Sequence, residues 1–212
     1  MKGRQSAMLL DKMRHAIGLD APFSIRDLAL IDPGFRQPTL ADWHRRGQVR
    51  MLARGWYVFA EAQVDLPVLF DVGCLAYPPA YVSLESALSW YELIPETVRS
   101  ITLVGTRATR TSTSDVATFV WRTLKPQRWF GYRVVEYGRE RRFLIAEPEK
   151  AVLDYLYLHP AMRTADDMLS LRLDTAGFAT LDHARLKQWA ARFEHARLMR
   201  QVSVLEEAMH HA

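Results

Sequence analysis

The residues of this sequence that could do chemistry are sparse, and the strongest group is the stretch EPEK, which contains Glu147, Glu149 and Lys150. In metal-dependent nucleases, carboxylates hold a cation and a lysine stabilises the charge that develops on the phosphate. Such elements usually lie on a strand with a further acid upstream, whereas Glu149 and Lys150 follow Pro148 at the start of a predicted helix. We therefore interpret the two glutamates as acids that complement a helix N-terminus.

Other nucleophiles and metal ligands lack the partners that their chemistry requires. Cys74 is the single cysteine and lies in an apolar stretch, so we interpret it as a small buried residue. Ser83 and Ser86 have no histidine at a readable spacing, and the adjacent His210 and His211 have no further ligands beside them. The ten glycines do not cluster into a phosphate-binding loop. The sequence thus predicts a protein that is not an enzyme, with no catalytic residues, metal site or cofactor.

The bulk composition is that of a folded globular protein with one large or two modest domains. The chain has 212 residues, of which 49% are hydrophobic and 25% charged. A single cysteine excludes an intramolecular disulfide scaffold and fits a reducing compartment. No run approaches the roughly 18 apolar residues of a membrane span, and charges interrupt the region where a signal peptide needs its apolar segment. We expect a soluble cytoplasmic protein with no membrane partner.

The net charge of +4 is unevenly distributed along the chain. Residues 1–60 contain ten Lys and Arg against five Asp and Glu, and residues 101–142 contain nine against three. The segments between and after these two blocks are acidic on balance. Basic blocks of this size are compatible with a polyanionic partner, although they also occur as ordinary solvated surface.

Two helices are predicted before residue 31. The apolar residues within 7–17 line one face of a helix, and Gly18 is placed to end it. The sequence SIRD follows, with Ser24 and Asp27 at capping-box spacing: a hydroxyl accepts a free amide proton and a carboxylate three residues later reaches back. A short second helix is therefore expected from Ser24 to about Leu30.

A third helix is predicted from about Leu40 to Arg46. The stretch IDPGFRQP before it contains two prolines and a glycine, which interrupt a helix, and TLAD then repeats the cap pattern. Leu40 and Trp43 share one face at i, i+3 and are expected to pack inward. The opposite face projects outward and carries Ala41, Asp42, Arg45 and Arg46.

A small hairpin follows, with strands at residues 49–52 and 56–59 and Gly55 able to take a positive φ at the turn. Three helices and a hairpin in this order are typical of a winged helix-turn-helix, whose third helix enters the major groove while the hairpin lies along the phosphate backbone. The same arrangement also serves as a protein-binding or structural module, and that alternative stays open. The residues predicted to contact DNA are Thr39, Ala41, Asp42, Arg45, Arg46, Arg50 and Arg54.

The remainder of the chain predicts a mixed second domain, so that the fold class is α+β. Prolines in residues 61–80 interrupt the helical pattern, which places a boundary between a domain of residues 1–62 and one of residues 63–212. A helix with Ser83 as its N-cap comes next, followed by short strands that we interpret as an antiparallel sheet. The C-terminal segments are helical, and Leu186, Ala190 and Phe193 form part of an apolar stripe.

The second basic block lies among these strands and alternates with aromatic residues such as Trp121 and Trp129. On a nucleic-acid surface, arginines meet phosphates and aromatic rings stack on bases. Aromatics at these spacings also form the core of a sheet, so a second contact surface for DNA flanks or an acidic partner is one of two interpretations. Its candidate residues are Arg107, Arg110, Arg139, Arg141 and Arg142.

The order of several motifs resembles the AbiEi-type antitoxins, which are transcriptional regulators of type IV toxin-antitoxin systems. The most specific blocks are YVSLESAL and PEKAVLDYL, with LARGWYVF before them and ITLVGTR and WFGY between them. The resemblance covers roughly residues 5 to 200. It implies an N-terminal domain that binds inverted repeats of double-stranded operator DNA, represses its own operon, and precedes a C-terminal antitoxin domain. It also implies a neighbouring nucleotidyltransferase-like toxin that the protein counters.

A second hypothesis belongs to a different class. In it the protein is an interaction module that neutralises a toxin through its C-terminal domain, does not bind DNA, and keeps the N-terminal helices only as a scaffold.

Overall fold

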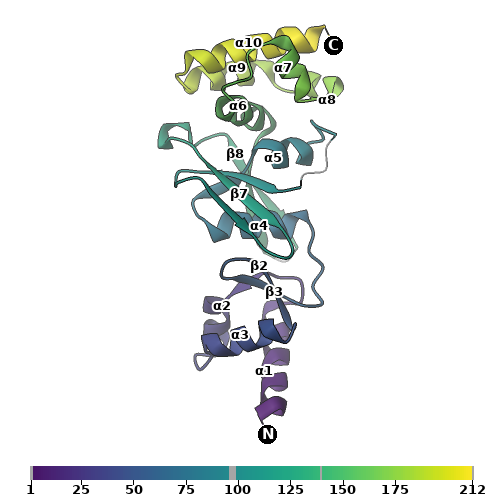
Figure 1. The fold of residues 1–212 in the computed structure, drawn as a ribbon, viewed down its shortest axis with the longest axis vertical. Helices are drawn as coiled ribbons and strands as arrows, with labels where there is room; N and C mark the ends of the chain where they lie inside the picture. The colour runs from purple at the N-terminus through teal and green to yellow at the C-terminus, as the bar shows by residue number, and fades with distance from the viewer. Residues whose placement is uncertain (1, 96–98, 139, 212) are drawn as a thin grey trace.

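The computed structural model describes residues 2–95, 99–138 and 140–211. The elements stack along the long axis of the molecule, with N-terminal helices at one end, a β-sheet in the middle and C-terminal helices at the other end (Figure 1). The two chain termini accordingly lie at opposite ends (Figure 1). Helices and sheets are both present in quantity, so the predicted α+β class is confirmed.

The N-terminal unit consists of three helices and a three-stranded sheet in the order β1-β3-β2. Its core contains Phe23, Leu28, Leu40 and Trp43, all essentially without exposed surface. The elements are α1 (Lys2–Ile17), β1 (Phe23–Ser24), α2 (Ile25–Ile31), α3 (Gln37–Arg45), β2 (Val49–Ala53) and β3 (Trp56–Phe59).

The capping box that starts α2 is confirmed. The backbone N–H of Ser24 donates to the carboxylate of Asp27 over 2.7 Å. The predicted start of α3 was wrong, because the helix begins at Gln37 with Arg36 as its N-cap. Pro38 lies in the first turn of α3, where the N–H that proline lacks would have no intrahelical partner. The proline is therefore part of the helix and does not mark a break before it. Thr39 is therefore a helical residue and not a cap.

The hairpin of β2 and β3 is confirmed, and Gly55 has φ +85° at its turn. Its side chains contribute to two different cores. Val49 and Phe59 are buried among the N-terminal helices. Leu52 and Val58 are buried in the core of the second unit. The hairpin is thus enclosed between the N-terminal helices and α4 (Leu66–Ala76), as Figure 1 also shows.

The second unit is built on a six-stranded sheet, and the predicted antiparallel arrangement was only partly right. Its outer pairs β6·β7 and β8·β9 are antiparallel, as is β4·β5, but β5·β7 and β4·β9 are parallel. The strand order is β6-β7-β5-β4-β9-β8. The strands are β4 (Ala80–Val82), β5 (Ile101–Gly105), β6 (Arg110–Thr113), β7 (Thr118–Thr123), β8 (Tyr132–Tyr137) and β9 (Arg141–Ala146).

Helices cover this sheet and continue beyond it. The predicted break over residues 61–80 was wrong in part, because α4 occupies most of it with Asp65 as N-cap and Pro67 in the first turn. The apolar stripe of α9 is confirmed, with Leu186, Ala190 and Phe193 all buried. The helices after α4 are α5 (Leu84–Trp90), α6 (Pro148–Leu158), α7 (Ala165–Ser170), α8 (Thr175–Ala179), α9 (His183–Arg192) and α10 (Ala196–His210), with a 3₁₀ turn at Pro126–Arg128. Over the described residues, the structure contains no helix with the length and apolar character that crossing a membrane requires.

Candidate nucleic-acid interface

The outward face of α3 is cationic and exposed. The side chains of Arg45 and Arg46 are 77% and 57% exposed, while Leu40 and Trp43 on the opposite face are buried. Both arginines form ion pairs with Asp42, which lies one helical turn before them, and the Arg46 Nε is 2.9 Å from the carboxylate. Exposed ion pairs of this kind contribute at most about 1 kcal/mol. The pairs orient the arginines without removing them from solvent.

The remaining predicted residues of α3 are less prominent. Ala41 is exposed, and Thr39 and Asp42 are partly buried. His44, which was not among the predicted contact residues, is also exposed on α3, and its ring centre lies 6.0 Å from that of Tyr57 on β3. Ala41 and His44 are spaced i, i+3 and so lie together on the helix surface. This spacing could have predicted His44 as a further residue of the outward face.

The side chain of Arg50 is bound to the protein's own backbone. Its guanidinium donates to the carbonyl of Ala62, its side chain is partly buried, and its Nε is buried without a partner. It therefore ties β2 to the segment that leaves the hairpin. The structure does not place Arg50 with the exposed cations of α3.

Arg54 is exposed at the hairpin tip and lies beside the second unit. A small cavity of about 50 Å³ is lined by Arg54, Tyr77, Arg110 and Ser112. The guanidinium carbons of Arg107 and Arg110 lie 4.0 and 5.2 Å from the centre of the Tyr77 ring. Arg54 from the first predicted site thus lines the same cavity as Arg110 of the predicted second basic surface, and Arg107 lies over the same Tyr77 ring as Arg110. We name these four residues, Arg54, Tyr77, Arg107 and Arg110, the tip cluster.

The other residues of the predicted second surface have different positions. Arg141 joins the two units, because its guanidinium donates to the Pro22 carbonyl over 2.7 Å and lies 3.7 Å from Asp71. Arg142 is exposed on β9. Arg139 lies outside the described residues. The four of these arginines that the structure describes therefore do not form one continuous surface.

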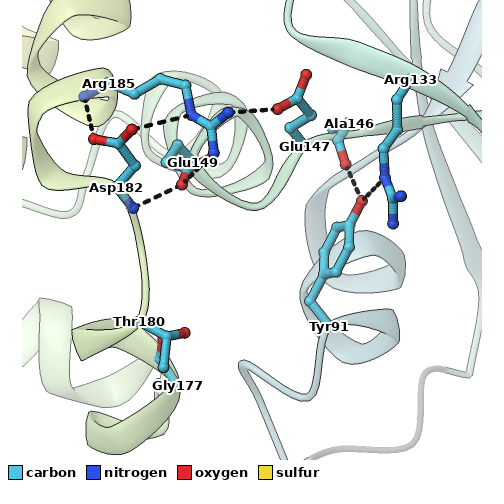
Figure 2. Close-up of polar contacts among 9 residues, drawn as sticks. All are labelled: Tyr91, Arg133, Ala146, Glu147, Glu149, Gly177, Thr180, Asp182 and Arg185. Atoms are coloured by element: carbon cyan, nitrogen blue, oxygen red, sulfur yellow. Dashed lines mark hydrogen bonds and ion pairs between the residues drawn. The ribbon is translucent and has the colours of Figure 1, made fainter.

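The glutamates of EPEK brace two helices together, as Figure 2 shows. Glu149 is 2% exposed, and its Oε1 accepts hydrogen bonds from the Asp182 backbone N–H and the Arg185 guanidinium at 2.9 and 3.0 Å. Arg185 also pairs with Glu147 at 3.0 Å. The hydrogen bond to Glu149, with the nearby acids, raises the pKa of Arg185 above its ordinary value. These contacts fasten the start of α6 to the start of α9.

Nearby, Tyr91 closes a second contact at the same end of α6. Its hydroxyl donates to the Ala146 carbonyl over 2.9 Å and accepts a hydrogen bond from Arg133 Nε over 3.3 Å (Figure 2). Burial raises the pKa of Tyr91, and Arg133 partly opposes that shift. The residues that Figure 2 joins by dashed lines are accordingly tied to backbone and to one another by structural contacts.

Lys150, the lysine of EPEK, has no exposed surface. Its ammonium group donates to Asp154 and, over 2.8 Å, to the hydroxyl of Tyr81, while Tyr81 and Ser83 donate to the same carboxylate over 2.8 and 2.9 Å. Burial lowers the pKa of Lys150 and raises that of Asp154, and their mutual attraction opposes both shifts. Ser83 precedes α5 as predicted, but its hydroxyl bonds to Asp154 and not to the helix N-terminus.

Comparison with known proteins identified no family for this chain. No protein-family model matches the chain, and the search of curated proteins found no match.

Proposed function

We propose that this protein is a DNA-binding transcriptional repressor and the antitoxin of a type IV toxin-antitoxin system, with a winged helix-turn-helix as its N-terminal unit. The observation that carries the proposal is the exposed outward face of α3, with Arg45 and Arg46 opposite the buried Leu40 and Trp43. The resemblance of the motif order to AbiEi-type antitoxins supports the same function.

In this function α3 enters the major groove. An arginine can donate two hydrogen bonds to the O6 and N7 atoms of a guanine, and each such contact discriminates between bases by about 1–3 kcal/mol. Asp42 holds Arg45 and Arg46 in position through its ion pairs before DNA binds. Two copies of the chain would read the two halves of an inverted repeat. Countering a nucleotidyltransferase-like toxin is assigned to residues 63–212 on the resemblance alone.

The test is binding to the DNA upstream of the protein's own gene. The variant Arg45→Ala/Arg46→Ala should bind this DNA about 30-fold more weakly or worse, since it removes two arginines that can each pair with a guanine. The control Lys125→Ala/Arg200→Ala removes the same charge at exposed positions away from α3. Equal affinity of the two double variants for this DNA would contradict the proposal.

The position of the hairpin favours a second candidate function. A wing must reach the DNA backbone, yet Leu52 and Val58 place one side of this hairpin in the core of the second unit. If the N-terminal unit is only a scaffold, the protein neutralises a toxin by direct contact and does not bind DNA. Co-purification with the product of the neighbouring gene, together with no affinity for the upstream DNA, would support this alternative over the first.

A further inference from the structure

We propose that the tip cluster is a phosphate-binding site for the backbone of the same DNA duplex that α3 reads. The inference rests on the proposed function and adds a second contact, formed jointly by the hairpin tip and the turn between β5 and β6. Sequence separation conceals this site, because its arginines belong to different units of the fold.

The first argument is the uncompensated charge of the cluster. Among the described residues, no ion pair with Arg54, Arg107 or Arg110 is present, whereas Arg45, Arg46 and Arg185 all have acidic partners. The guanidinium groups of Arg107 and Arg110 both lie over the Tyr77 ring, which attracts cations only modestly. Like charges gathered around one ring repel one another. A phosphate would relieve that repulsion with charge-assisted hydrogen bonds.

The second argument is the rigidity of the surroundings. Tyr77 ends α4, and its ring packs 5.6 Å from that of Trp121. The indole N–H of Trp121 donates to the Gly73 carbonyl over 2.9 Å, which fixes α4 on the sheet. On the hairpin side, the Ser114 hydroxyl donates to the Leu52 carbonyl over 2.8 Å. The site is therefore formed before a ligand arrives, which lowers the entropic cost of binding.

The third argument identifies the occupant as duplex DNA. Strand β2 leads from the end of α3 to the hairpin tip, and its five residues span roughly 15 Å at the usual rise per residue. This length is comparable to the major-groove width of about 12 Å. A helix placed in the groove would thus leave the tip near the flanking phosphates. Arginines that meet phosphates fix position and carry no sequence information.

The experiment measures how duplex affinity depends on salt. The variant Arg54→Ala/Arg107→Ala/Arg110→Ala should weaken binding to operator and unrelated duplexes by the same factor. The slope of log affinity against log salt should become shallower by about 0.9 for each phosphate that the variant no longer neutralises. The control Lys125→Ala/Arg163→Ala/Arg200→Ala removes three exposed basic side chains elsewhere and should keep the slope of the wild type.

The outcomes separate this site from the function on which it rests. Loss of operator preference in Arg45→Ala/Arg46→Ala, with an unchanged slope in the tip-cluster variant, overturns the inference and leaves the proposed function standing. Wild-type protein that binds no duplex overturns both. Glutamine versions of the three substitutions keep the long side chains, and they replace the alanine versions if the melting temperature falls.

Discussion

The ammonium group of Lys150 is held inside the core by charge, hydrogen bonds and aromatic rings together. It lies 4.9 and 5.1 Å from the ring centres of Phe193 and Phe130 and pairs with Asp154 one helical turn away. Burying two charges is costly, and the pair tolerates burial because Tyr81 and Ser83 satisfy the remaining bonds of the carboxylate. The residue thus connects α6 to the central strand β4 and to the C-terminal helices.

Removing one member of this pair should be strongly destabilising. In Lys150→Met, Asp154 remains buried without its counter-charge, so the free energy of unfolding in urea should fall by about 3–5 kcal/mol. The double variant Lys150→Met/Asp154→Leu removes both charges and should recover part of that decrease. A single variant with the stability of the wild type would show that water or another group compensates the carboxylate.

Cys74 is only partly buried, so the prediction of a buried residue was wrong in part, but its alkylation at alkaline pH should still be slow. Burial raises the pKa of its thiol from 9.0 to about 12, and a backbone hydrogen bond with Leu144 only partly opposes this shift. Iodoacetamide reacts with the thiolate. The rate for the native protein should therefore still rise as the pH passes well beyond 9.0, whereas the rate in urea levels off there.

The same shift has a defined effect on stability. The unfolded chain releases the thiol proton near pH 9, and the native protein keeps it to about pH 12. The thiol's contribution to stability is therefore complete below pH 9 and decreases as the pH rises toward 12. Equal alkylation rates in native and unfolded protein between these two pH values would contradict this assignment.

At the scale of elements, the pairing of β4 with β5 depends on a close approach at Gly105. A Cβ atom there would lie 2.8 Å from the backbone carbonyl oxygen of Pro79, next to the Ala80 to Gly105 pair. Gly105→Ala should destabilise the protein by about 1–3 kcal/mol, since overpacking against backbone cannot be relieved by a rotamer change. Gly105→Val should cost more. Thermal unfolding measures both, and an unchanged melting temperature for Gly105→Ala would refute the close approach.

Elements specified by local chemistry were predictable from the sequence. The capping box of Ser24 and Asp27 and the stripe containing Leu186 and Ala190 need only neighbours within one or two turns. The start of α3 was missed because Pro38 is compatible with both a break and a first turn. Strand β4 has three residues, too few for a periodic pattern. The parallel pairing of β4 with β9 arises from tertiary packing, which local propensity does not encode.

At the scale of the whole molecule, the N-terminal unit should not be fully stable alone. A fragment of residues 1–62 would expose Leu52 and Val58, which are buried by the second unit in the full chain. We expect the fragment to melt at a lower temperature than the full chain and to bind a hydrophobic dye. Replacing Leu52 with Ser and Val58 with Thr should reduce dye binding. Cooperative unfolding without dye binding in the unmodified fragment would contradict the shared core.

Some residues of the candidate site could be predicted from local sequence, whereas others are brought together only by the tertiary fold. Arg45 and Arg46 were predictable because helical periodicity alone sets them opposite Leu40 and Trp43. The cavity shared by Arg54 and Arg110 was not, since more than fifty residues separate the two arginines in the sequence. The bridging role of Arg141 was missed for the same reason, as its partner Pro22 lies in the other unit.

Because the hairpin is enclosed between two hydrophobic cores, the N-terminal unit cannot be exchanged freely for another domain. A graft of a different DNA-reading unit onto residues 63–212 would have to supply apolar side chains in the places of Leu52 and Val58. Without them the receiving surface of α4 would be left open to water. Conversely, a substitution in α4 that disturbs this packing would also disturb the strand on which α3 rests, because β2 contacts both helices.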